Sequence, residues 1–331
     1  MRSISLLFLC LLFLQCNTQR PAFKTTRPDR FVKFIKEKEL KSNLYQLASD
    51  AMEGRETGEE GQKKAAKFLE KFYRQNNIAP ALEEGYFQAV PGSYFEHKFK
   101  DTENVAAFIK GVEKPEEIVV ISAHYDHLGA KNEQIYYGAD DDASGTVAVM
   151  QTAKAFKKAA QRGFYPRRSV LFLHLTGEEK GLLGSRYYTE NPIFPLEQTV
   201  ANLNTDMVGR VDQAHHKSPN YVYLIGSNRL STALDSLVQQ QNKKYTALEL
   251  DYTYNAEDDP NRFYYRSDHY NFAKHKIPVV FFFNGVHEDY HKPTDTPDKI
   301  NYSLLKTRTE LLFYSAWEVV NREDRLVVDV E

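Results

Sequence analysis

The sequence reads Ile118-Val119-Val120-Ile121-Ser122 and continues Ala123-His124-Tyr125-Asp126. A short apolar run of this kind is typical of a strand that is buried on both faces of a sheet. Similar runs follow at 170–175, 200–203, 221–225 and 279–283, and segments with helical patterns at 146–160 and 230–241 lie between them. This alternation predicts the fold class α/β, a three-layer α/β/α sandwich with a mixed, mostly parallel central sheet.

The flanking regions contain weaker patterns. Apolar residues between Phe31 and Leu47 recur at helical spacing and predict one helix that ends near Asp50. Thr57 and Glu60 have the spacing of a capping box for a second helix. Segment 86–109 predicts strands at the edge of the sheet, and segment 304–320 predicts a closing helix. No repeat or long linker marks a second domain, so we expect residues 21–331 to form a single catalytic domain.

The composition is that of a globular protein. Hydrophobic residues make up 42% of the chain and charged residues 27%, which is sufficient for a packed core. The formal net charge of -2 gives no global reason to expect binding to nucleic acid or to an anionic membrane. Any charge that matters for function must therefore be local.

The first 20 residues have the pattern of a signal peptide, an apolar run from Ile4 to Leu14 followed by polar residues. The two cysteines, Cys10 and Cys16, both lie in this segment, so the mature chain is expected to contain no internal disulfide. Cys16 also stands where a bacterial lipoprotein carries its lipidated cysteine, although Gln15 departs from the small residue usual before it. Both interpretations predict export from the cytoplasm, as a periplasmic, membrane-anchored or secreted protein.

Metal-competent side chains follow the predicted strands. In open α/β sheets the functional groups gather beyond the carboxyl ends of the strands. The residues that follow four of these strands are His124, Asp126 and Asp140 to Asp142; Glu178 and Glu179; Asp206; and His287 to His291. Imidazole and carboxylate are the usual ligands of a hydrolytic zinc site. The run of three aspartates has a second interpretation as a solvated acidic loop at a helix N-terminus, and adjacent glutamates are common there too.

The joint pattern is more specific than its parts, and it extends over nearly the whole mature chain. Its motifs are Leu47-Ala48-Ser49-Asp50, Gly54-Arg55 and Gly58, Ser122-Ala123-His124-Tyr125-Asp126, Gly138-Ala139-Asp140-Asp141-Asp142-Ala143-Ser144-Gly145, Gly177-Glu178-Glu179, Asn204-Thr205-Asp206-Met207-Val208-Gly209, Ser267-Asp268-His269 and Tyr290-His291. Together they resemble the zinc aminopeptidases of metallopeptidase family 28, co-catalytic dizinc exopeptidases that are related to glutaminyl cyclases. The resemblance implies the phosphorylase/hydrolase-like fold of zinc exopeptidases.

The resemblance also implies roles for individual residues. Two zinc ions would be bridged by Asp141, with His124 and Asp206 completing the ligands of one ion and Glu179 and His291 those of the other. Glu178 would be the general base, and Asp126 would hold the second ring nitrogen of His124. Tyr290 would donate a hydrogen bond to the oxyanion, although ordinary packing is an open alternative for this tyrosine. The resemblance further implies a cis peptide between Asp141 and Asp142.

Other residues near these motifs receive no metal from the resemblance. We expect His127, His269 and His287 to be loop or supporting residues, and His215 and His216 to be exposed. Segment 252–265, rich in Tyr, Asp and Asn, is a candidate wall of the substrate pocket.

The implied reaction is hydrolysis of the first peptide bond of a peptide with a free N-terminus, by a water molecule activated between the two zinc ions. Three alternatives stay open at this stage. A glutaminyl cyclase would use one zinc ion, but such enzymes depart from the Asp-Asp-Asp-Ala-Ser-Gly motif. A non-catalytic binding ectodomain on this fold would have lost ligands that are present here. Carboxypeptidase or dipeptidase activity would need the same metal centre with different pocket walls.

Overall fold

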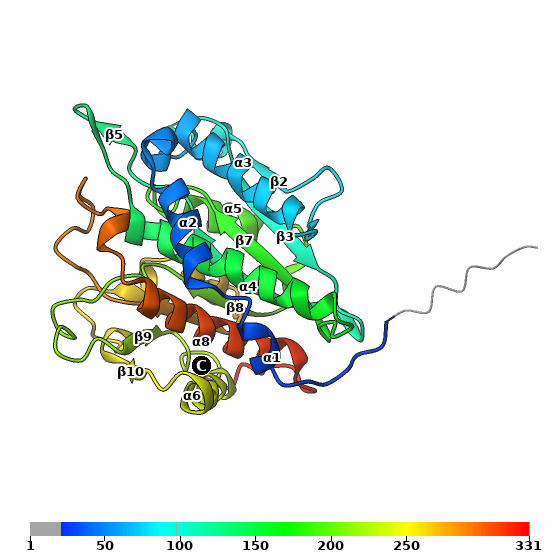
Figure 1. The fold of residues 1–331 in the computed structure, drawn as a ribbon. Helices are drawn as coiled ribbons and strands as arrows, with labels where there is room; N and C mark the ends of the chain where they lie inside the picture. Colours follow the sequence, from blue (N-terminus) through cyan, green and yellow to red (C-terminus); the bar gives the residue numbers. More distant parts are fainter. Residues whose placement is uncertain (1–20, 97, 331) are drawn as a thin grey trace, which may run out of the picture.

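The computed structural model describes residues 21–96 and 98–330, so the predicted signal peptide, with Cys10 and Cys16, lies outside the described residues. The described chain folds into layers of helices around one large sheet (Figure 1). The helices are α1 (Asp29–Val32), α2 (Glu37–Leu47), α3 (Glu60–Gln75), α4 (Gly145–Ala160), α5 (Leu183–Glu190), α6 (Thr232–Tyr245), α7 (His269–Lys274) and α8 (Tyr302–Asn321). The strands of the sheet are β1 (Ala79–Pro80), β2 (Phe87–Val90), β3 (Thr102–Ile109), β4 (Lys114–His124), β7 (Arg168–Leu175), β8 (Thr199–Thr205), β9 (Tyr221–Ile225), β10 (Glu249–Asp251) and β11 (Val279–Phe283).

The sheet has nine strands in the described part of the chain, in the order β1-β3-β7-β4-β8-β11-β9-β10, with β2 also paired to β3. Strand β4 is parallel to both β7 and β8, and β8 is parallel to β11. Strands β3 and β9 are antiparallel to their neighbours β7 and β11. The predicted mixed, mostly parallel sheet is therefore confirmed.

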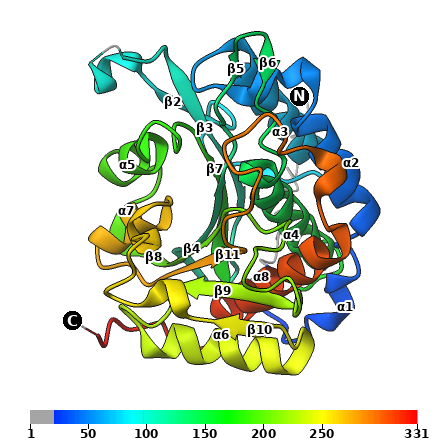
Figure 2. The same cartoon turned by 90° about the vertical axis from the view of Figure 1, so that its left-hand side faces the viewer.

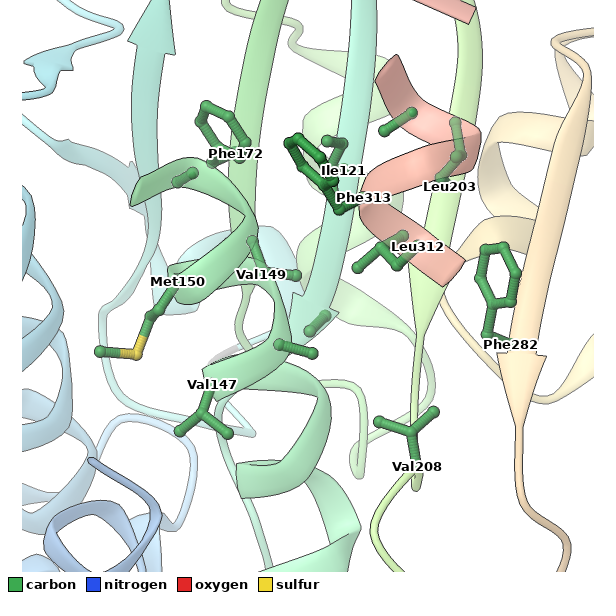
Figure 3. Packing of buried hydrophobic residues seen from close by; sticks show 14 of the residues in the cluster. Ile121, Val147, Val149, Met150, Phe172, Leu203, Val208, Phe282, Leu312 and Phe313 are labelled. Atoms are coloured by element: carbon green, nitrogen blue, oxygen red, sulfur yellow. The ribbon is translucent and has the colours of Figure 1, made fainter. Parts of the chain in front are cut away.

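Helices cover both faces of the sheet (Figure 2). Strand β4 shows why, because its alternate residues enter two different cores. Val119 and Ile121 belong to the core under α4 and α8, with Val147, Leu312 and Phe313 (Figure 3). Ile118 and Val120 belong to the opposite core under α5 and α7, with Tyr188 and Phe272. A strand that is apolar on both faces is stable only between two such layers.

Three local predictions need correction. The predicted first helix is two helices, α1 and α2, because Lys36 adopts an extended conformation between them. Segment 86–109 contains β2, which lies at the edge of the sheet as predicted, and β3, which does not, since β1 and β2 pair with its outer side. Thr57 does not cap α3, whose N-cap residue is Glu59 without a side-chain capping bond. The Thr57 hydroxyl is directed to a distant carboxylate described below.

A short hairpin, β5 (Ala130–Lys131) and β6 (Gln134–Ile135), extends from the body beyond β4 (Figure 1). Among the residues that the model describes, we find no helix with the length and apolarity that a membrane crossing requires.

Candidate active site

The predicted metal-competent residues meet at one edge of the sheet. Strands β4, β7, β8 and β11 are mutually parallel, so their carboxyl ends share this edge. His124 is the last residue of β4, and Glu178, Asp206 and His291 lie on the segments that follow β7, β8 and β11. Asp141 reaches the same place from the turn that precedes α4.

A first group consists of His124, Asp141 and Asp206. The His124 Nε2 atom lies 3.2 Å from Asp141 Oδ1 and 3.6 Å from Asp206 Oδ1. All three side chains are buried. The Ser267 hydroxyl donates to the other oxygen of Asp206 at 2.7 Å and so fixes the orientation of that carboxylate.

A second group consists of His127, Asp141 and Glu179, with His291 beside it. The His291 Nε2 atom lies 3.1 Å from Asp141 Oδ2 and 3.2 Å from Glu179 Oε2. His127 Nδ1 lies 2.8 Å from Glu179 Oε1. His127, which the sequence interpretation left as a supporting residue, therefore contacts a predicted ligand directly. The two groups share Asp141 through its two different oxygens.

The residues of these groups fit divalent zinc. The donor set is imidazole and carboxylate, and its members approach one another without forming ordinary hydrogen bonds. His124 Nε2, both ring nitrogens of His127 and Glu179 Oε1 are buried, and none has a hydrogen-bond partner with suitable geometry among the described residues, since the 2.8 Å contact of His127 Nδ1 with Glu179 Oε1 is poorly aligned. Buried polar atoms are otherwise almost always paired, so converging unpaired lone pairs indicate a site built for cations.

The three consecutive aspartates have three different tasks. Asp140 accepts hydrogen bonds from the Gly209 N–H at 2.7 Å and from Asn284 at 3.0 Å. Asp142 accepts from the Gly145 N–H at 2.8 Å and the Met207 N–H at 3.0 Å. Only Asp141 belongs to the candidate metal groups of the described residues, and the peptide that joins it to Asp142 is cis, as the resemblance implied.

Asp295 supports this turn and was not predicted. Its carboxylate accepts the backbone N–H groups of Asp140 and Asp141, at 3.0 Å and 3.2 Å respectively. Asp295 lies more than 150 residues further along the chain and carries no local signal of this contact.

Asp126 supports both His124 and Glu178. Its backbone carbonyl lies 3.2 Å from His124 Nδ1, while its carboxylate Oδ1 lies 3.7 Å from the same nitrogen. The carboxylate instead accepts the Thr57 hydroxyl at 2.7 Å and the Glu178 N–H at 3.2 Å. The Thr57 side chain, expected to cap a helix, thus orients a carboxylate within the site.

Arg55 connects several backbone segments that surround the site. This guanidinium is fully buried and donates to the backbone carbonyls of Leu47, Tyr125, Tyr137 and Gly138, at 2.8 to 2.9 Å. Gly138 immediately precedes the aspartate turn, so Arg55 connects that turn to the end of β4. Burial lowers the pKa of the Arg55 guanidinium, and the charges of Asp141 and Asp126 partly oppose this shift.

Replacing Arg55 with Met is expected to lower the free energy of unfolding by about 3 kcal/mol, because buried carbonyl groups lose charged donors. Urea unfolding of both proteins in the presence of chelator measures this difference. Arg27→Met is the control, since 74% of the Arg27 side chain is exposed, and it is expected to leave stability unchanged. A change below about 0.5 kcal/mol in Arg55→Met would contradict the structural role, because ordinary surface substitutions have effects of that size.

Glu178 stands beside both groups but belongs to neither. Burial raises the pKa of the Glu178 carboxyl well above its usual range. The charge of His124 opposes this shift, while Asp206, Glu179 and Asp268 add to it. Glu178 is half-buried and lines the pocket without belonging to the metal-competent groups, so its carboxylate is suited to exchange a proton.

A pocket opens over these residues. It is lined by Asp141, Glu178, Asp206, Met207, Phe263, Arg266, Phe281, Phe283, Val286, Tyr290 and His291. The Tyr290 ring stacks on His291 with centroids 3.8 Å apart, and its hydroxyl accepts a hydrogen bond from Arg266 at 3.4 Å. From the predicted wall 252–265 only Phe263 lines the pocket. Tyr254 packs behind it, 4.7 Å from the Phe263 ring.

Asp268 is a buried acid whose oxygens have no hydrogen-bond partner among the described residues. Burial, followed by the charges of Asp126 and Asp206, raises the pKa of Asp268 from 3.8 to about 7. The charge of His124 opposes this shift. An acid with a raised folded-state pKa binds its proton more tightly in the folded state than in the unfolded state.

We therefore expect Asp268 to make the metal-free protein lose stability as the pH rises from about 4 to about 7. Asp268→Asn is expected to flatten this dependence, so that its unfolding free energy exceeds that of the wild type increasingly toward pH 7. Urea unfolding at pH 4.5, 6 and 7.5 in chelator measures both curves. Parallel curves would show that Asp268 is not protonated in the folded protein.

The predictions for the other histidines are confirmed for some residues and wrong for one. His287 contacts Asp140 at 3.2 Å, and His269 packs on Phe281, both outside the candidate metal groups. His216 is exposed as predicted, but the prediction for His215 is wrong. His215 is buried because its ring stacks on Tyr221 at 3.5 Å and its nitrogens lie 3.0 and 3.2 Å from Asp212 and Asp251.

The sequence of this region matches a known family model. The model of peptidase family M28 matches residues 104–316, which is more than half of the chain. The chain belongs to peptidase family M28. The match begins in β3 and ends in α8, so all the candidate metal-binding residues of this M28 chain lie within it.

The M28 chain is similar to curated proteins, one of which is named as an aminopeptidase. A probable leucine aminopeptidase of Arthroderma otae is 28% identical over 242 residues, which are 71% of this chain and 62% of the relative. The leupeptin-inactivating enzyme 1 of Streptomyces exfoliatus is 27% identical over 61% of this chain and 45% of its own length. The chain thus spans less than two thirds of the length of these curated relatives.

Solved structures show the same fold. A zinc aminopeptidase from Bacillus subtilis, BSAP, superposes with a TM-score of 0.67 at 17% identity, covering 90% of this chain and 99% of that one. LapB from Legionella pneumophila superposes with a TM-score of 0.73 at 19% identity, covering 92% of this chain and 78% of that one. At these identities the likeness concerns the fold, and the chemistry of the M28 chain must be argued from its own residues.

Proposed function

We propose that this chain is a zinc-dependent aminopeptidase that hydrolyses the first peptide bond of peptides with a free N-terminus. The observation that supports this most directly is the pair of buried donor groups that share Asp141 beside a pocket containing an uncommitted carboxylate, Glu178. A carboxylate that offers one oxygen to each group is suited to bridge two metal ions. Family membership and the names of the relatives agree with this proposal.

In this proposal His124 and Asp206 complete one zinc site, and Glu179 and His291 complete the other. His127 orients the Glu179 carboxylate from the side opposite His291. Asp126 and Thr57 hold His124 and the backbone of Glu178 in place. Two bound zinc ions would lower the pKa of a water molecule toward neutrality and polarise the scissile carbonyl.

The protein's own residues carry out the proton transfers. Glu178 accepts the proton of the attacking water and delivers it to the nitrogen of the departing peptide. The Tyr290 hydroxyl donates a hydrogen bond to the carbonyl oxygen as negative charge develops there. Burial keeps the pKa of Tyr290 well above its usual range, so this hydroxyl retains its proton.

The walls of the pocket favour an apolar first residue. Met207, Phe263, Phe281 and Phe283 present apolar surface close to Asp206 and Glu178. Burying a leucine or phenylalanine side chain against such a wall stabilises the complex by roughly 1.5 to 3 kcal/mol.

A panel of aminoacyl fluorogenic substrates, assayed with and without chelator, tests the proposal. We expect hydrolysis of apolar aminoacyl substrates, loss of activity in chelator, recovery with zinc, and close to two zinc ions per chain by mass spectrometry. A stoichiometry near one, with cyclisation of N-terminal glutamine, would instead identify a glutaminyl cyclase. Release of residues from the C-terminus would identify a carboxypeptidase. Zinc binding without any turnover would identify a binding domain.

We also propose that residues 1–20 direct the chain out of the cytoplasm and that Cys16 provides a lipid anchor. Mass spectrometry of the mature N-terminus tests both parts. Cleavage just before a diacylated Cys16 is the expected result. Cleavage elsewhere in the segment would support a soluble exported form, and an intact Met1 would contradict export.

A further inference from the structure

Arg266 occupies an unusual place in the pocket. Its guanidinium lies 4.8 Å from the centre of the Phe263 ring, and the residue lines the same pocket as Glu178 and Asp206. Its Nη2 atom donates to the Tyr290 hydroxyl at 3.4 Å. Within the described residues no carboxylate lies within ion-pair distance of Arg266, and its other guanidinium N–H groups have no hydrogen-bond partner.

The positive charge of Arg266 differs from the character of every other residue that lines the pocket. The other lining residues of the pocket are apolar, aromatic, acidic or histidine, so Arg266 is the one permanent cation among the described residues that line it. The acidic residues of the lining belong to the candidate metal groups, apart from Glu178. A guanidinium presents a planar fork of five N–H donors, and this fork matches the geometry of a carboxylate. Stacking on Phe263 holds the fork in one orientation while it stays accessible to a ligand.

We propose that Arg266 binds a carboxylate group of the peptide substrate. This inference rests on the proposed peptidase function and specifies its substrate class. The carboxylate has two possible sources, the side chain of an acidic first residue or the free C-terminus of a dipeptide. Both are close in a short peptide to the bond that is cleaved, and Arg266 is close to Tyr290, which is positioned over His291.

Arg266→Gln tests the inference because glutamine keeps a donor for Tyr290 and removes the positive charge. The substrates are Glu-Gly amide, Leu-Gly and Leu-Gly amide, which carry a side-chain carboxylate, a C-terminal carboxylate and neither. The measured quantities are the ratios of kcat/KM for each carboxylate-bearing peptide over Leu-Gly amide. Ratios are used because loss of the Tyr290 contact alone would slow all three peptides together.

We expect one of the two ratios to fall about tenfold in Arg266→Gln, as the loss of one accessible charge-assisted pair implies. A fall for Glu-Gly amide identifies an acidic first residue, and a fall for Leu-Gly identifies the dipeptide C-terminus. Arg262→Gln is the matched control. Arg262 is exposed and lies over Tyr265, outside the pocket lining. Its replacement is therefore expected to leave both ratios unchanged. Two ratios that change less than twofold in Arg266→Gln would overturn the inference.

A binding measurement separates this inference from the proposed function. Calorimetry with the zinc-loaded Glu178→Gln protein, with and without Arg266→Gln, gives affinities for the same three peptides without turnover. An affinity ratio that falls about tenfold would support carboxylate binding by Arg266 even if the wild type hydrolysed none of the peptides. In that case the peptidase proposal would fail and the binding site would stand. Unchanged affinity ratios alongside normal hydrolysis would overturn the Arg266 inference alone.

Discussion

Glu178→Gln is expected to lower kcat by about 10³-fold while the zinc content stays at the wild-type value, because a general base contributes 10²–10⁴-fold. The amide has the shape of the carboxylate and cannot accept the proton of water. Glu178 belongs to neither donor group, so its replacement should leave the metal ligands in place. Because burial disfavours the Glu178 carboxylate, the neutral amide is expected to fold at least as stably.

Three measurements check this expectation: kcat on a leucyl substrate, zinc per chain, and the thermal unfolding midpoint. Glu318→Gln, at an exposed position on α8, is the control for the chemical change itself. Activity within about threefold of the wild type would remove Glu178 as the base. A parallel loss of zinc would show that Glu178 is a ligand rather than a base.

Asp141→Asn is expected to have the largest effect on metal binding. One side chain contributes an oxygen to each donor group, at 3.2 Å from His124 Nε2 and 3.1 Å from His291 Nε2. An amide carries no charge and is a poor bridge, so both zinc ions should be lost and activity should fall below detection. The wild type should gain about 2.7 kcal/mol of stability from each zinc ion at a hundred times its Kd, and the variant should lose most of this gain.

The measurement is urea unfolding of both proteins with zinc and with chelator, together with zinc analysis after dialysis. The chelator arm reports whether Asp141→Asn folds, so a folding defect is distinguished from a binding defect. Asp324→Asn, at an exposed position near the C-terminus, is the matched control and should keep the full zinc-dependent gain. Retention of two zinc ions by Asp141→Asn would contradict a shared carboxylate.

The sheet was predictable because buried parallel strands carry continuous apolar runs. The runs at 118–122, 170–175 and 279–283 became β4, β7 and β11, since such segments are stable only between two helical layers. The position of the site followed from the same rule, because the carboxyl ends of these strands share one edge. The break at Lys36 was not predictable, since the apolar spacing continues across it and no proline or glycine stands there.

Contacts between distant segments account for the other differences. The spacing of Thr57 and Glu60 suits a helix cap, but the Thr57 hydroxyl donates to Asp126, 69 residues away, and that choice depends on how the loop packs against β4. His215 lies in a polar segment, yet the ring of Tyr221 and the carboxylates of Asp212 and Asp251 enclose it. Local composition reports neither contact.

By itself the sequence determined which segments are buried as strands and which residue types follow them, because both properties are local along the chain. Composition and spacing left the choice among the three adjacent aspartates open; the family resemblance implied Asp141, and only the tertiary structure gives the physical reason for it. Asp140 is held by the Gly209 N–H and Asp142 by the Met207 N–H, both on the segment that follows β8, and Asp141 is left to face the site. That selection depends on bringing backbone donors more than 60 residues away against one turn, which no local pattern can encode.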